Sequence, residues 1–126
     1  MTWTVLFVCP HGAGKSRLAA AFFNRMAPPG WHATSAGQEP DPVLSPLAAS
    51  LLGDDPAAAW LDQNPPRSID AVDAPARVIA IDTDLPGAER WSLRQQDLDE
   101  TTRDELHTRA EALAEEIGRH GTERHG

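Results

Sequence analysis

Residues 3–16 read WTVLFVCPHGAGKS, and this stretch decides the interpretation of the chain. Its first part, residues 3–8, is a continuous β-branched and apolar run, which is typical of a strand covered on both faces of a parallel sheet. A loop with two glycines and a proline follows, and the apolar spacing of residues 15–26 predicts a helix. A strand, a glycine-rich loop and a helix that begins at Lys15-Ser16 form a cradle for an anion, because loop amides and the helix dipole favour negative charge. Phosphate or a similar oxyanion is therefore the expected ligand.

Composition excludes several classes of protein. The chain has 126 residues with 11 Lys and Arg against 19 Asp and Glu, a net charge of −8. This acidity argues against nucleic acid and against anionic membranes as partners, since both require clustered positive charge. No apolar run approaches the roughly 20 residues that span a bilayer, and no signal-peptide pattern is present, so the expected location is the cytoplasm. One cysteine excludes an intrachain disulfide and an all-cysteine zinc site.

Further elements alternate along the chain. Strands are predicted at 31–35, 77–81 and 89–93, helices at 42–52 and 99–119, and a short helix at 57–61. Residues 54–75 are the hardest to interpret, and the polar tail 120–126 is expected to be flexible. The alternation predicts one α/β domain over residues 1–126, a three-layer sandwich with a four-stranded parallel sheet. The loop after the first strand would lie in the binding crevice at the carboxyl ends of the strands.

The lone cysteine, Cys9, heads the glycine-rich loop. It is either an inert buried residue at a strand end or a working nucleophile whose thiolate is stabilised by the loop. A nucleotide-binding P-loop, G-x-x-x-x-G-K-[ST], matches at Gly14-Lys15-Ser16, but its first glycine falls on Cys9. In that alternative, Asp82 after the third strand would serve the magnesium ion.

Residues 5–16 also resemble the signature of the low-molecular-weight protein tyrosine phosphatases and their arsenate reductase relatives. That signature is a strand, C-x5-R-S and a helix, with Lys15 here at the arginine position. The resemblance extends over most of the chain, to residues 18–23 in the first helix, 35–37 (SAG), 40–42 (PDP), 78–82 in the third strand, Trp91 and the final helix. It implies flavodoxin-like winding of the sheet.

The resemblance implies a role for each residue of the motif. Cys9 would attack phosphorus and form a phosphocysteine, Ser16 would support the thiolate, and Lys15 with the loop amides would hold the oxyanion. The phosphate-binding residues on this basis are Pro10, His11, Gly12, Ala13, Gly14, Lys15 and Ser16. No metal or cofactor is expected, and the partner is a phosphorylated substrate or an oxyanion such as phosphate or arsenate.

Three positions depart from the family pattern. Lys15 lacks the planar fork of arginine, and Gly12 replaces a typical asparagine. The family's general acid, counted from Trp91, falls on Gln95, which cannot donate a catalytic proton. Asp97 is the substitute acid that we consider, whereas Asp99 is better explained as a helix cap.

Two further residues keep alternative interpretations. His11 could bind substrate or stabilise the thiolate, or it could simply face solvent. Asp82 and Asp84 end a strand at the edge of the crevice, where aspartates also occur for reasons of turn geometry.

Three functions therefore compete. The first is hydrolysis of a phosphomonoester through a phosphocysteine, weakened by the departures at Lys15 and Gln95. The second is arsenate reduction with an external thiol, because a single cysteine removes any internal disulfide relay. The third is a catalytically impaired module that binds oxyanions and regulates without turnover.

Overall fold

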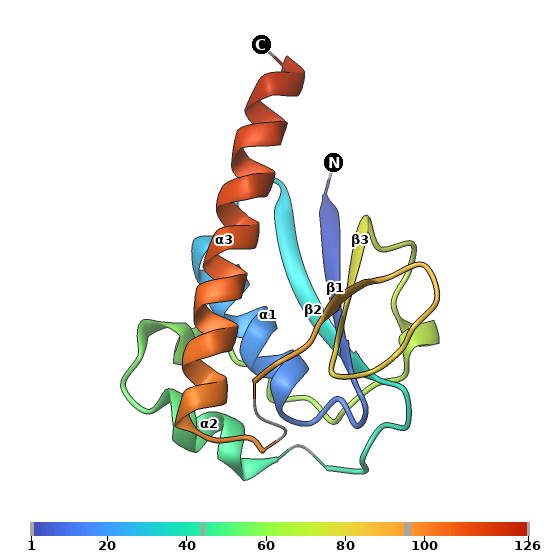
Figure 1. Cartoon of the computed structure of the whole chain (residues 1–126), viewed down its shortest axis with the longest axis vertical. Helices are drawn as coiled ribbons and strands as arrows, with labels where there is room; N and C mark the ends of the chain where they lie inside the picture. Colours follow the sequence, from blue (N-terminus) through green and yellow to red (C-terminus); the bar gives the residue numbers. More distant parts are fainter. Residues whose placement is uncertain (1, 44, 95–96, 126) are drawn as a thin grey trace.

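The computed structural model describes the backbone of residues 2–43, 45–94 and 97–125, and side chains up to Arg119 (Figure 1). The strands are β1 (Trp3–Cys9), β2 (Trp31–Gly37), β3 (Arg77–Ile81) and β4 (Glu89–Trp91). The α-helices are α1 (Lys15–Met26), α2 (Pro46–Leu52) and α3 (Glu100–His125), and two 3-10 helices are η1 (Pro56–Trp60) and η2 (Ile69–Ala71).

The four strands form one parallel sheet in the order β2-β1-β3-β4. Strand β1 lies inside it, with Val5 beside Ala33 of β2 and beside Arg77 of β3. The continuous apolar run of β1 is explained by this position, because residues 5–9 are buried throughout. The predicted α/β fold with a four-stranded parallel sheet is confirmed.

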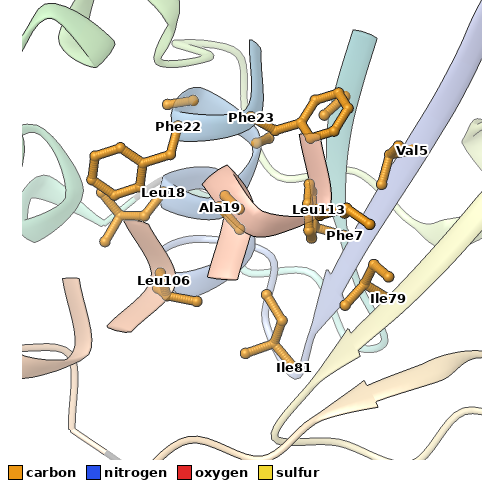
Figure 2. Packing of buried hydrophobic residues seen from close by; sticks show 14 of the residues in the cluster. Val5, Phe7, Leu18, Ala19, Phe22, Phe23, Ile79, Ile81, Leu106 and Leu113 are labelled. Atoms are coloured by element: carbon orange, nitrogen blue, oxygen red, sulfur yellow. The ribbon is translucent and has the colours of Figure 1, made fainter. Parts of the chain in front are cut away.

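One face of the sheet is covered by α1 and α3, which pack against each other (Figures 1 and 2). Val5 and Phe7 point from β1 into this layer, where Phe23 of α1 meets Phe7 edge-on with ring centroids 6.3 Å apart. Leu106 and Leu113 close the layer from α3. This apolar layer holds α1, and therefore the loop before it, rigidly on the sheet.

The opposite face is covered by a thinner layer. Leu6, Val8 and Ala36 point to this side, where Ile69 of η2 and Val72 after it pack against them. The part of the segment between α2 and β3 around η2, which the sequence left almost uninterpreted, therefore forms the second covering layer, whereas Ala57 and Leu61 at η1 pack in the first layer.

Several predicted boundaries need correction. The second helix begins at Pro46 and not at residue 42, because Ser45 caps it by accepting a hydrogen bond from the Leu47 amide (3.2 Å). The final helix continues to His125 instead of ending at Arg119, since no proline follows to stop it. Strand β2 extends to Gly37, and β4 ends at Trp91.

No helix in the described part of the chain has the length and apolar character needed to cross a membrane.

Candidate active site

The chain changes direction in the sheet at the carboxyl end of β1. From β1 it passes through α1 to β2 on one side, and it later enters β3 on the other side of β1. In open α/β sheets, ligands bind at such a switch point, outside the carboxyl ends of the strands. The loop from Cys9 to Ser16 leaves β1 there, and Asp82 leaves β3 there.

The Cys9 thiol lies at the base of this loop and is buried. Its Sγ is 3.1 Å from Ser16 Oγ, and the Gly12 amide donates a hydrogen bond to it over 3.2 Å. Both the Ser16 hydroxyl and the Gly12 amide can donate a hydrogen bond to this sulfur. The structure thus brings Cys9 and Ser16 together as the sequence motif predicts.

The carbonyl groups of the loop are bound on its outside. Backbone amides of Gln38, Glu39, Asp41 and Ser45 donate to the oxygens of Cys9, Pro10, His11 and Ala13, respectively. The Gly12 oxygen accepts from Arg17 Nε (3.0 Å), and the Gly14 oxygen accepts from the Leu18 amide. Carbonyl oxygens repel anions. Because these hydrogen bonds engage the carbonyl oxygens of the loop, the backbone amides are left to favour an anion within it.

Two glycines allow the loop to close against β2. Gly12 has φ +68°, in the left-handed region, and a Cβ there would lie 2.6 Å from the Gly37 nitrogen. A Cβ on Gly37 would in turn lie 2.5 Å from the His11 carbonyl carbon. The close approach explains the glycine of the Ser35-Ala36-Gly37 motif, and Gly12 supplies a backbone conformation that glycine or asparagine adopts readily.

Lys15 is bound to an acidic partner. Its Nζ lies 2.8 Å from Asp82 Oδ2, and both side chains are largely buried. Asp82 has φ +52° and also accepts the Leu93 amide through Oδ1 (2.8 Å). The ion pair spans the switch point and offsets the charge that Lys15 would offer to an oxyanion.

A second group of charged side chains contacts the loop through Arg17, and it was not predicted from the sequence. The side chain of Arg17 is fully buried, and its Nη1 donates to the Asp62 backbone oxygen (2.6 Å) and lies 3.9 Å from Asp62 Oδ1. Asp62 Oδ2 accepts from Arg67 (2.6 Å). We call these three side chains the Arg17–Asp62–Arg67 cluster. One signal was available, since Arg17 is followed directly by the apolar run Leu18-Ala19-Ala20-Ala21-Phe22-Phe23 of the predicted helix.

The remaining predicted residues lie at the rim. His11 is exposed, with Nδ1 3.3 Å from the Glu39 oxygen and 3.5 Å from Asp41 Oδ1, which fits the solvent-facing alternative. Asp97 is exposed, and its neighbour Leu98 lies against Gly14 of the loop. Asp99 accepts the Thr102 amide (3.0 Å), so it caps α3 as expected. Gln95 lies outside the described residues.

Several solved structures of known proteins have the same fold. An arsenate reductase from Archaeoglobus fulgidus has a TM-score of 0.69 and 28% sequence identity, over 87% of this chain and 98% of its own. This chain therefore shares the fold of the arsenate reductases and low-molecular-weight protein tyrosine phosphatases. The YwlE arginine phosphatase from Geobacillus stearothermophilus has a TM-score of 0.74 and 22% identity, over 98% of both chains.

A low-molecular-weight protein tyrosine phosphatase from T. tengcongensis has a TM-score of 0.69 and 19% identity, over 91% of this chain and 99% of its own. These phosphatase identities establish a shared fold and no more. No family model matches the sequence.

Proposed function

We propose that this protein is a cysteine-dependent hydrolase of phosphomonoesters that works through a phosphocysteine. The observation that carries the proposal is Cys9 Sγ, held by Ser16 Oγ and the Gly12 amide at the base of a loop whose carbonyls are bound outside. The neighbours, which include both phosphatases and arsenate reductases, support an enzyme of this fold.

In the first step, the phosphate group of the substrate binds in the loop. Cys9 Sγ attacks phosphorus, a sulfur–phosphorus bond forms, and the ester oxygen–phosphorus bond breaks. The loop amides stabilise the charge that builds on the non-bridging oxygens, and Ser16 and Gly12 hold the thiolate before attack. Lys15 contributes after its ammonium group shifts from Asp82 toward the bound phosphate.

The leaving oxygen then takes a proton, for which Asp97 is the candidate. The contact between Leu98 and Gly14 keeps this segment beside the loop, and the exposed position of Asp97 suits an acid that meets substrate from solvent. Good leaving groups, such as p-nitrophenolate, depart without that proton. In the second step, water attacks the phosphocysteine and releases phosphate and the Cys9 thiolate.

Arsenate reduction is the second candidate, favoured by the 28% identity to an arsenate reductase and by the single cysteine. Arsenate would condense with Cys9 and lose water. An external thiolate would then attack the Cys9 sulfur, so that sulfur is oxidised to a mixed disulfide while arsenic is reduced and leaves as arsenite. A second external thiol would restore Cys9.

Hydrolysis of p-nitrophenyl phosphate by wild type, Cys9→Ser and Lys15→Arg tests the proposal. The good leaving group makes the assay independent of the general acid. We expect low activity in wild type, none in Cys9→Ser, and a gain of about tenfold in Lys15→Arg, since an arginine fork holds two oxygens at once.

Other outcomes decide between the alternatives. Arsenate-dependent consumption of a small thiol, without ester hydrolysis, would identify the reductase. Phosphate binding without turnover, unchanged in Lys15→Arg, would leave the impaired regulatory module.

A further inference from the structure

The loop needs a positive charge that Lys15 does not supply in this structure. Lys15 and Asp82 form a buried pair, and their opposite charges largely cancel. The protein as a whole carries a net charge of −8, so its overall field disfavours an anion. A thiolate and a bound phosphate would together place several negative charges in the loop.

The Arg17–Asp62–Arg67 cluster carries a net positive charge, whereas the Lys15–Asp82 pair does not. Two guanidinium groups and one carboxylate leave one positive charge. Burial lowers the pKa of Arg17 and the charge of Asp62 opposes that change, but a guanidinium stays protonated. Arg17 Nη2 is buried and has no hydrogen-bond partner among the described residues, so the side chain retains unused donor capacity.

The same cluster holds the loop mechanically at two places. Arg17 Nε binds the Gly12 oxygen, while the amide of Gly12 donates to Cys9 Sγ. The backbone oxygen of Arg67 accepts from the amide of Gly37, the residue against which Gly12 closes. Arg67 is itself fixed to β2 through Thr34 Oγ1 and the Ser35 oxygen, both at 2.9 Å.

We propose that Arg17, held by Asp62 and Arg67, is a positioning residue that aims the Gly12 amide at Cys9 and supplies the positive charge that keeps the thiol ionised. This deepens the proposed function, which needs a thiolate nucleophile. A fully buried arginine is costly, and its cost is offset here by a network that ends at the reacting sulfur. Other charged or titratable groups beside the loop include Lys15, Asp82, His11, Glu39, Asp41 and Asp97.

The test measures how fast iodoacetamide alkylates Cys9 as a function of pH. The chain has only this cysteine, so the rate reports one sulfur, and the pH midpoint of the rate reports its ionisation without any need for turnover. We expect Arg17→Gln to raise the midpoint by about one pH unit, and Arg67→Gln by about half a unit.

The variant Asp62→Asn tests whether the cluster acts on Cys9 through its charge or only by holding the loop in place. It keeps the backbone oxygen that Arg17 binds but raises the excess charge of the cluster, so we expect the midpoint to fall by about half a unit. The control is Arg25→Gln, which removes one positive charge from the exposed end of the same helix. Its midpoint should stay within about 0.2 unit of wild type because solvent screens the charge.

Opposite shifts in the Arg17 or Arg67 variant and in Asp62→Asn support the proposal. Shifts in the same direction, or shifts no larger than in Arg25→Gln, would overturn it. If Arg17→Gln does not fold, as circular dichroism would show, the Arg67 and Asp62 variants decide. Opposite midpoint shifts in a protein without phosphatase activity would uphold this proposal and reject the proposed function.

Discussion

The two sides of the Cys9 loop carry charge in different ways. On one side, which we call the front, Lys15 is paired with one carboxylate, Asp82, across the switch point of the sheet. On the other side, which we call the back, Arg17 and Arg67 share the single carboxylate of Asp62. The front is therefore nearly neutral until a ligand draws Lys15 away, whereas the back keeps an excess positive charge whether or not a ligand is bound.

If Cys9 is the nucleophile as proposed, this difference lets a loop with lysine in place of arginine still hold a thiolate. Ionisation of Cys9 would depend on the permanent charge behind the loop and on the amides. Binding of the oxyanion would depend on releasing Lys15 from Asp82. The two contributions can be separated by variants that act on one side at a time.

The largest effect is expected where the two sides meet, at Gly12. Gly12→Ala forces a Cβ into the Gly37 backbone at a left-handed φ, so we expect loss of measurable hydrolysis and about 2–5 kcal/mol of stability. Urea unfolding and the p-nitrophenyl phosphate assay measure these changes. The control is Gly87→Ala, where φ is +82° but nothing lies within 4 Å of a Cβ. Equal effects in both variants would show that the close approach of the loop to β2 is unimportant.

A smaller effect is expected from releasing Lys15 alone. Asp82→Asn retains an oxygen for the Leu93 amide but removes the charge that holds the ammonium group. Inorganic phosphate should then inhibit hydrolysis at a concentration about three- to tenfold lower. Asp84→Asn is the control, because it removes an exposed carboxylate from the same loop. Weaker inhibition in Asp82→Asn would mean that the ion pair orients Lys15 for binding rather than withholding it.

The smallest effect concerns the contribution of Asp62 to the stability of the fold as pH falls. Burial opposes ionisation of Asp62, but hydrogen bonds from Arg67 and the Asn64 amide outweigh it and lower the pKa of Asp62 below its usual value. A lowered pKa stabilises the fold above the unfolded value of about 4, and this stabilisation is lost as pH falls through the folded value. Asp62→Asn should therefore lower Tm by a few degrees at pH 7 and by less near pH 3, as thermal unfolding would show. If the difference in Tm between wild type and Asp62→Asn were the same at pH 7 and near pH 3, the ionised carboxylate of Asp62 would not stabilise the fold.

Much of this arrangement was predictable from local pattern. The apolar run of β1, the glycine loop and the helix after it define the sheet and the Cys9–Ser16 pair, because each is encoded within a few neighbouring residues. The boundary of α2 was missed because a Ser-Pro cap at residues 45–46 ended the extended segment later than apolar spacing indicated.

The charges around the loop were harder to predict because they depend on contacts between distant residues. Arg17 and Asp62 are 45 positions apart, and Lys15 and Asp82 are 67 apart. Asp62 lies in a segment rich in proline and aspartate that has little regular structure, so no periodicity marked it. An arginine within an apolar helix was the one local sign that a partner had to exist.

Trapping the intermediate tests the central claim most directly. Wild-type protein is mixed with p-nitrophenyl phosphate, quenched during turnover in an alkaline denaturant, which preserves a sulfur–phosphorus bond, and measured by intact and peptide mass spectrometry. The account predicts the added mass of one phosphoryl group on the peptide that contains Cys9, and none in Cys9→Ser. Hydrolysis that persists in Cys9→Ser, or a phosphoryl group on any other residue, would contradict it.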